Sequence, residues 1–187
     1  MIRSGTALVL LASCAGDGTT TTSSSCEDPD MTLTLGTGAD SYVALAEGDP
    51  VTLVHGPQGG WHIEVSGQVA HTSQEVAILP TITVVSSGDQ IAGDQNQNLM
   101  ALSNFDDASC SGEFFGVNAL VGDPHPEDTL PESCYICSLA GELLDLSITV
   151  EDFNSGDSVT ETVQVIVEPD PGDVEPCATA KQEGNCP

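Results

Sequence analysis

Hydrophobic and polar residues alternate along much of this chain, which is the pattern of β-strands that bury one face. In residues 31–35 the apolar side chains are separated by threonines, and residues 78–85 are a run rich in β-branched residues. Pro80 inside that run predicts an edge position or a bulge. Residues 61–69 alternate as well, and there we expect four side chains to share the buried face: Trp61, Ile63, Val65 and Val69.

The clearest alternation lies near the C-terminal end and predicts a β-hairpin. Polar residues separate the apolar ones from residue 144 to 150, and valines alternate again from residue 163 to 167. Between them, residues 154–157 (NSGD) have the composition of a turn. The side chains expected to face the core are Leu144, Leu146, Ile148, Val150, Val163, Val165 and Val167.

The fold class follows from these runs. No segment carries an apolar stripe at helical spacing for more than two turns, so we predict an all-β domain of about seven to nine strands over residues 26–168. The passage ITVEDFNSGDS at residues 148–158 resembles the closing strand pair of PKD, cadherin-like and other immunoglobulin-like modules of bacterial surface proteins. The resemblance implies an immunoglobulin-like β-sandwich and carries no function with it.

The charge balance is strongly acidic. The 187 residues include 29 Asp and Glu against two basic residues, Arg3 and Lys181, for a formal net charge of −27. This field repels phosphates and anionic headgroups, which excludes nucleic acid as a partner. The acids are dispersed among apolar residues that form 39% of the chain, so we interpret them as the solvated surface of one folded domain. The alternative is a protein that binds Ca²⁺ through these acids.

The N-terminal residues have the layout of an export signal. One early positive charge precedes a short apolar run at residues 7–12, far shorter than a membrane span. Leu11, Ala12, Ser13 and Cys14 resemble the lipobox of bacterial lipoproteins. The resemblance implies that residues 1–13 are a signal peptide and that Cys14 receives a lipid. Ala15 stands where some lipoproteins carry an Asp that retains them in the inner membrane, which favours the outer membrane.

The rest of the chain divides by composition. Residues 14–25 include Cys14, the lipid attachment site that the lipobox resemblance implies, and a Thr/Ser-rich stretch typical of a flexible tether. The β-sandwich is expected at residues 26–168, followed by a Pro/Gly-rich tail at residues 169–187. This plan predicts a lipid-anchored protein of the bacterial cell envelope, on the periplasmic or the cell-surface face, where thiols oxidise.

With Cys14 assigned to lipid, six cysteines remain, which predicts three disulfides. Cys177 and Cys186 lie close together in the tail and are expected to pair with each other. The pairing of the other four stays open: Cys26, Cys110, Cys134 and Cys137. The spacing of the last two could serve a redox or zinc site, but no second such pair exists in the sequence, so we interpret them as structural.

A glycine-rich stretch, HGPQGGWH at residues 55–62, joins two predicted strands beside the only tryptophan. Parity along the strands places His55 and His62 on opposite sides and makes Trp61 the first buried residue after the loop. The candidate partner-facing loop is Gly56, Pro57, Gln58, Gly59 and Gly60. With the lipobox and the acidic body, the stretch resembles small uncharacterised lipoproteins of Gram-negative bacteria that carry Gly-Pro-Gln-Gly-Gly-x-His.

Metal and cofactor sites are not predicted. His55, His62 and His71 could bind copper or zinc, but alternation puts the last two on opposite faces unless a bulge at Gly67 intervenes. An EF-hand-like start at residue 94 has Leu99 where the loop needs Gly, and lacks its closing Glu. Looser Ca²⁺ sites remain an alternative at two acidic stretches, residues 106–107 and residues 122–132.

No enzyme signature is present either. The sequence has no nucleophile elbow, no HExxH motif and no phosphate-binding loop. We therefore predict a non-enzymatic binding or structural module whose partners are the membrane, through the lipid, and an unknown protein or surface ligand. An exported hydrolase is the less favoured alternative.

Overall fold

Strands dominate the computed structural model, which describes residue 26 and residues 30–93, 97–125 and 131–186. Of the described residues, 53% are in strands and 11% in helices, which confirms the all-β prediction. The eleven strands among the described residues outnumber the seven to nine expected, because four of them are too short to show alternation. The strands are β1 (Thr32–Thr37), β2 (Val43–Ala44), β3 (Asp49–His55), β4 (Trp61–Ala70), β5 (Glu75–Val84), β6 (Gln90–Ala92), β7 (Asn98–Ala101), β8 (Ser103–Asp106), β9 (Ser111–Val121), β10 (Leu143–Asp152) and β11 (Ser158–Pro169).

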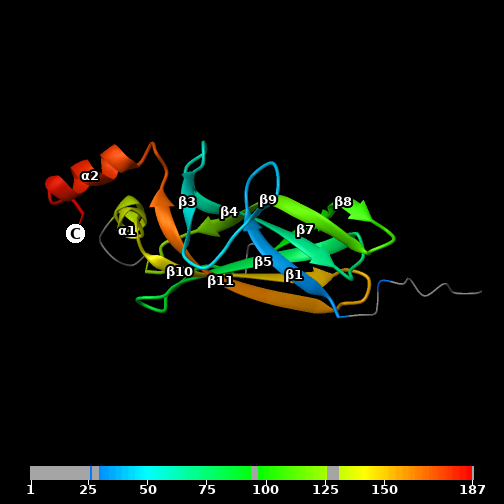
Figure 1. The fold of residues 1–187 in the computed structure, drawn as a ribbon. Coiled ribbons are helices and arrows are strands. Elements are labelled where there is room, and N and C mark those ends of the chain that lie inside the picture. Colours follow the sequence, from blue (N-terminus) through cyan, green and yellow to red (C-terminus); the bar gives the residue numbers. More distant parts are fainter. Residues whose placement is uncertain (1–25, 27–29, 94–96, 126–130, 187) are drawn as a thin grey trace, which may run out of the picture.

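The strands form two layers that share one continuous sheet (Figure 1). In one layer β4 lies between β9 and the pair β1 and β3, and β8 extends the layer beyond β9. In the other, β10 lies between β11 and β5, whose far edge pairs with β7 and β6. The layers join where β3 pairs antiparallel with β4 and parallel with β11.

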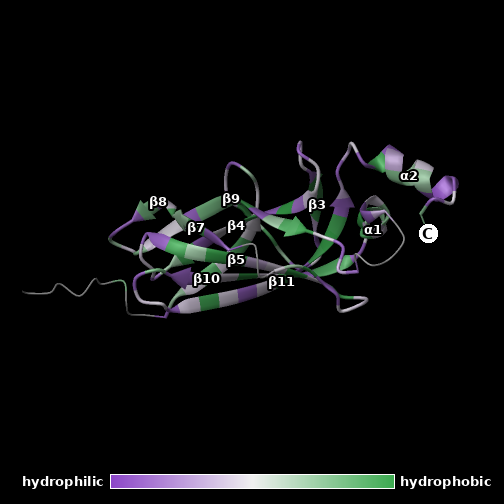
Figure 2. Ribbon diagram, turned by 180° about the vertical axis from the view of Figure 1, so that it is seen from behind, coloured by the Kyte–Doolittle hydropathy of each residue, from purple (hydrophilic) through white to green (hydrophobic). Residues whose placement is uncertain are grey.

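The core lies between the layers and includes most of the apolar positions that alternation predicted. Hydrophobic and hydrophilic bands alternate along the strands in Figure 2. The predicted residues of β10 are fully buried, and those of β11 are at most 7% exposed. Burying such side chains contributes about 1.5–3 kcal/mol each, so the alternation accounts for the packing of the hairpin.

Pro80 lies inside β5, which pairs along its whole length with β10. On its other edge, β5 pairs with β7 through residue 78 and with β6 from residue 82. Pro80 therefore falls between the two segments, where a missing amide hydrogen interrupts no ladder. β5 is therefore not an edge strand, and the predicted edge position holds only locally, at the unpaired stretch around Pro80.

The β4–β9 pair contains a bulge near Gly67, where the sequence had allowed one. Three residues of β4, from Val65 to Gly67, lie opposite four of β9, from Phe114 to Val117. The extra residue is thus on β9, where Gly116 has a φ of 67°, a value that favours glycine. A Cβ built on Gly67 would lie 2.6 Å from the fully buried ring of Phe114.

Three disulfides close the described chain, and one of them corrects the sequence prediction. Cys26 pairs with Cys110, but Cys186 pairs with Cys134 and Cys177 with Cys137, so the predicted local Cys177–Cys186 bond is wrong. The tail forms helix α2 (Val174–Gln182), which contains Cys177, whereas Cys186 follows four residues after its end. The helix rises about 1.5 Å per residue and so carries the chain away from Cys177 before Cys186 is reached.

The partners of these two cysteines lie on the second helix, α1 (Glu132–Ser138). Cys134 and Cys137 are three residues apart, so both lie on one buried side of α1 and each bonds one tail cysteine. Three structural disulfides and a structural role for the Cys134–Cys137 spacing are thereby confirmed. Neither helix, nor any other in the part described, is long and apolar enough to cross a membrane.

We predict that Gly67→Ala lowers the free energy of unfolding by about 1–3 kcal/mol, because the new methyl group overlaps the Phe114 ring in a packed core. Urea denaturation of the oxidised protein measures the change. The matched control is Gly122→Ala, where a Cβ meets nothing within 4 Å. Equal stability of the two variants would contradict the close packing at Gly67.

Candidate functional site

The β3–β4 loop projects from the sheets as an ordered turn (Figure 1). The amide of Gly56 donates to the carbonyl of Gly60 at 2.9 Å, and the amide of Gly59 donates back to Gly56 at 3.0 Å. Gly59 and Gly60 have φ values of 84° and 82°, so both need the freedom of glycine. Residues 57–60 are exposed, and Gln58 lies near the tip.

Two aromatic rings at the base of the loop share one carboxylate. His55 and Trp61 are register partners whose rings stack with centroids 4.5 Å apart. The Nε1–H of Trp61 donates to Oδ2 of Asp173 at 2.7 Å, and Nδ1 of His55 lies 2.9 Å from Oδ1 of the same residue. Trp61 also packs against the core, as predicted. The loop is thus braced on a side chain that follows it by more than a hundred residues.

Asp170 adds a second brace from the same segment. Its carboxylate accepts the amide of Gly172 at 2.7 Å and the amide of His55 at 3.3 Å, and these two hydrogen bonds lower the pKa of Asp170 below its ordinary value. The amide of Asp170 in turn donates to the carbonyl of Leu53 at 3.1 Å. Sequence reasoning missed both aspartates, because only the register of β3 on β11 brings them to the loop.

The histidines do not converge. His62 pairs with Val54, one position from the His55–Trp61 pair, so His55 and His62 leave on opposite sides as parity predicted. His71 follows the end of β4, at the other end of the molecule from the loop. Within the described residues, no group of three or more His, Cys, Asp or Glu side chains is placed to hold a metal ion.

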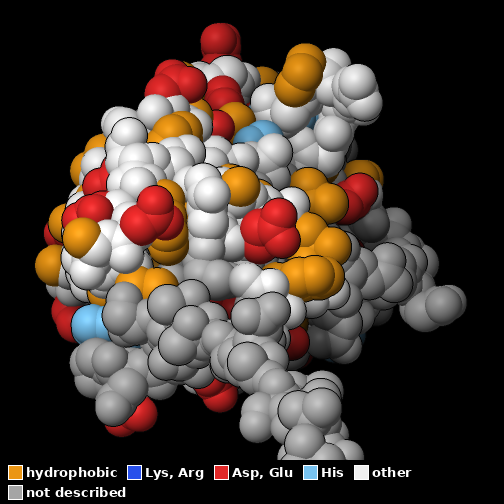
Figure 3. Space-filling model, turned by 90° about the vertical axis from the view of Figure 1, so that its right-hand side faces the viewer, with side chains coloured by type: hydrophobic (Ala, Val, Ile, Leu, Met, Phe, Trp, Pro, Cys, Tyr) orange, Lys and Arg blue, Asp and Glu red, His pale blue; other side chains and the backbone are white. Residues whose placement is uncertain are grey.

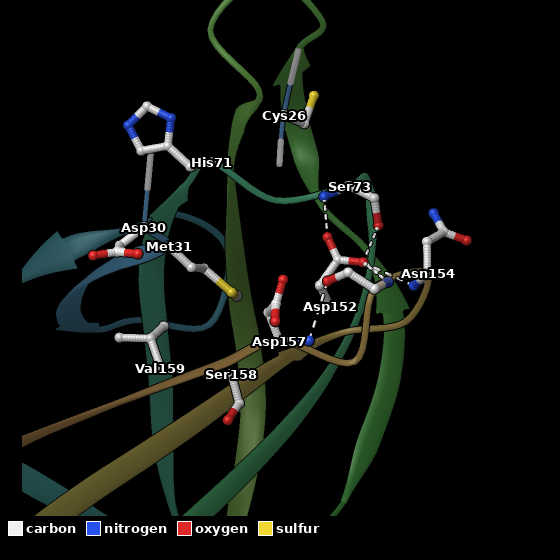
Figure 4. A pocket seen from close by; sticks show the side chains of 11 residues that line it. Cys26, Asp30, Met31, His71, Ser73, Asp152, Asn154, Asp157, Ser158 and Val159 are labelled. Atoms are coloured by element: carbon white, nitrogen blue, oxygen red, sulfur yellow. Dashed lines mark hydrogen bonds between the residues drawn. The ribbon is translucent and has the colours of Figure 1, made fainter. Parts of the chain in front are cut away.

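A cavity of about 330 Å³ opens at the end of the molecule away from α2, near the β10–β11 turn (Figure 4). The sequence did not predict it, since its walls come from three distant segments. The lining residues are Cys26, Asp30, Met31, His71, Ser73, Asp152, Asn154, Ser155, Asp157, Ser158 and Val159.

Asp152 organises one wall of this cavity. It is 6% exposed and accepts hydrogen bonds from the hydroxyl groups of Thr72 and Ser73 at 3.0 Å each and from the amide of Ser73. The amides of Asn154 and Ser155 donate to it at 2.7 and 3.1 Å. Burial opposes the charged carboxylate, but these hydrogen bonds together lower its pKa. Asp152 therefore ties the β10–β11 turn to the β4–β5 connection.

The cavity contains a Ser, a His and an Asp, but their geometry is not that of a hydrolytic triad. The hydroxyl of Ser73 donates directly to Asp152, with no imidazole between them. Figure 4 shows His71 on the other side of the cavity from Ser73. Among the described residues His71 makes no hydrogen bond to either group, so no base is positioned to activate the serine.

The acidic stretches considered for Ca²⁺ are engaged in their own turns. Asp106 accepts the amide of Ala108 at 3.0 Å and the hydroxyl of Ser109 at 2.8 Å, and these bonds lower its pKa. In the second stretch, Asp123 accepts the amide of His125 at 2.7 Å, and residues 126–130 lie outside the described part. Each carboxylate satisfies local backbone donors.

Comparisons with known proteins add little. No protein-family model matches the chain, and no curated protein is significantly similar to it. Among solved structures, it is similar to the CooA pilin subunit from enterotoxigenic Escherichia coli, with 15% identity and a TM-score of 0.34, over 74% of this chain and 99% of that one. Values this low transfer no activity or partner to this protein.

We predict that Asp152→Asn lowers the free energy of unfolding by about 2–3 kcal/mol at pH 7, because it leaves buried donors without an acceptor. A carboxyl with a lowered pKa contributes stability above its unfolded pKa of about 3.9 and loses it as the pH falls through the folded value. The difference between wild type and variant should thus shrink in acid. Urea denaturation between pH 7 and pH 3 measures it.

The control for this prediction is Asp157→Asn in the same turn. Asp157 is exposed, and its carboxylate makes no hydrogen bond among the described residues. The control should therefore stay close to wild type at every pH. A difference for Asp152→Asn that does not change between pH 7 and pH 3 would contradict the role given to the charge.

Proposed function

We propose that this protein is a lipid-anchored component of the bacterial cell envelope whose β-sandwich is a non-enzymatic binding or structural module. The signal peptide, the lipid site and the tether fall on residues 1–25, which lie outside the described residues. Support for the proposal comes from the disulfides, from the acidic surface and from the braced β3–β4 loop.

The disulfides are the observation that carries the proposal. Three cross-links in one small domain indicate an oxidising compartment outside the cytoplasm. They also use all six cysteines other than Cys14, so the chain contains no further cysteine with which Cys14 could pair. A single leftover cysteine at the end of a lipobox is what lipid attachment requires.

The β3–β4 loop is the proposed surface for the partner. Its glycines are surrounded by open space, since a Cβ on Gly59 or Gly60 would meet nothing within 4 Å. Its base is held by the stack of His55 on Trp61 and by Asp173, whose side chain is only 15% exposed. A loop ordered before binding costs less conformational entropy on association than a mobile one.

The first prediction concerns the anchor. Cys14→Ala should move the protein from the membrane fraction to the soluble fraction, because it removes the thiol to which the lipid would attach. Fractionation followed by immunoblotting measures the shift, and Ser24→Ala, within the proposed tether, is the matched control. If the Cys14→Ala protein stays in the membrane fraction, lipid anchoring is wrong.

The second prediction concerns the loop. Gln58→Arg should reduce partner capture from envelope extract about tenfold or more, because it puts a charge and extra bulk at the centre of the proposed contact. Gln182→Arg, an exposed position on α2, is the control with the same change of charge. Equal capture by both variants would exclude the loop. Capture that needs added Ca²⁺, with a higher melting temperature in Ca²⁺, would favour the cation-binding alternative.

A further inference from the structure

An apolar patch lies at the end of the molecule away from α2, on the outer face of the layer formed by β10, β5 and β7. Phe153 and Leu99 are its largest members, and at 63% and 68% they are the most exposed large hydrophobic side chains among the described residues. They line one groove of about 320 Å³ together with Glu75, Val76, Met100 and Ala101. Figure 3 looks onto this end and shows hydrophobic side chains beside acidic ones.

The exposure of Phe153 comes from an inversion of the strand pattern. Along β10 the inward positions are apolar up to Val150, but the next inward position is Asp152, and Phe153 points outward. The five hydrogen bonds to Asp152 fix the turn, and the amide of Phe153 donates to the carbonyl of Glu75 at 3.0 Å. The aromatic ring is therefore presented to solvent by a rigid support.

The patch lies at the end of the domain where the segment from the proposed anchor enters, so the membrane is the surface expected to cover it. Cys26 lines the cavity beside the β10–β11 turn and is bonded there to Cys110. Cys14 precedes Cys26 by twelve residues, a length of chain that spans at most about 40 Å when extended. A lipid on Cys14 would thus hold this end of the domain next to the bilayer.

We propose that Phe153 and Leu99 form a second membrane contact, which docks the domain on the surface of the bilayer that holds the lipid. The proposal rests on the anchor at Cys14. The lipid alone fixes how far the domain can move from the bilayer, and apolar side chains buried in the interface would add to membrane binding. Docking would also set the orientation of the domain, with the β3–β4 loop and α2 directed away from the membrane.

The charges beside the patch define the kind of surface it fits. Glu75 lines the groove. Glu151 of β10 is the register partner of Ala77 of β5, and Ala77 is the register partner of Leu99 of β7, so Glu151 lies in the same row as Leu99. These carboxylates disfavour anionic lipid, so the expected surface is zwitterionic and the insertion shallow. Adding anionic lipid should weaken docking.

The test attaches the chain to vesicles chemically. Residues 14–187 are coupled through Cys14 to a maleimide-headgroup lipid in phosphatidylcholine vesicles with brominated acyl chains, which quench tryptophan within the membrane. A Trp61→Phe background removes the native signal, and Phe153→Trp reports the patch. The control reporter is Val174→Trp on α2, which is 52% exposed at the other end.

Docking predicts quenching of the Phe153→Trp reporter about twofold or more above that of the Val174→Trp reporter. Adding Leu99→Ser, at a position whose side chain is exposed and supports no core, should reduce that quenching. Equal, weak quenching of both reporters overturns the proposal. The proposal is also overturned if quenching depends on the density of protein on the vesicles and the protein self-associates in solution. The patch would then bind a second copy of the chain and not the membrane.

Disulfide mapping and circular dichroism show whether each reporter variant is folded. If the Trp61→Phe background is not folded, the same coupling is made with the native Trp61 present. Quenching is then compared between proteins with and without Phe153→Trp. Because the anchor is supplied chemically, a negative result overturns docking alone. A failure of the Cys14→Ala fractionation instead overturns the cellular anchor.

Discussion

The pairing of β11 with strands from both layers is the constraint on which most of this structure depends. β11 pairs antiparallel with β10 along the hairpin and parallel with β3 from Val165 to Pro169. The parallel segment joins the two layers, so the core between them is closed on that side. It also determines where the chain goes next, because Pro169 leaves the sheet beside Leu53, two residues before the loop.

The tail follows from that exit point. Asp170 and Asp173 reach the base of the β3–β4 loop within four residues of the end of β11, and α2 begins immediately after them. From there α2 reaches α1, where two disulfides hold the tail. The loop, the two aspartates and the cross-linked helices therefore form one connected unit at this end of the domain, although they come from three separate parts of the sequence.

The other end is organised around a buried carboxylate. Asp152 takes an inward position that alternation reserves for an apolar side chain, and its cost of burial is offset by five hydrogen bonds from the two connections that it joins. The same residue explains why Phe153 faces outward. The two ends thus differ in chemistry: one presents a polar, glycine-rich loop, and the other an aromatic side chain on a fixed turn.

The sequence by itself determined the elements whose information is local. Period-two alternation identified β1, β4, β5 and the terminal hairpin, because a strand that buries one face alternates apolar and polar residues along consecutive positions. Parity placed His55 and His62 correctly for the same reason. The number of cysteines predicted three disulfides, and the glycines predicted the loop. The short strands β2, β6, β7 and β8 were missed, since two to four residues show no period.

Only the tertiary structure decided which distant residues meet. The Cys177–Cys186 prediction failed because proximity in sequence does not show how the chain between two cysteines is folded. Most of the chain between Cys177 and Cys186 is the helix α2, and each of the two cysteines bonds a cysteine of α1 instead. Asp173 could not be assigned to Trp61 across 112 residues without the register of β3 on β11. Disulfides, carboxylate braces and cavities depend on the packing of whole strands, and that packing is set by the sum of many weak contacts that no short stretch of sequence contains.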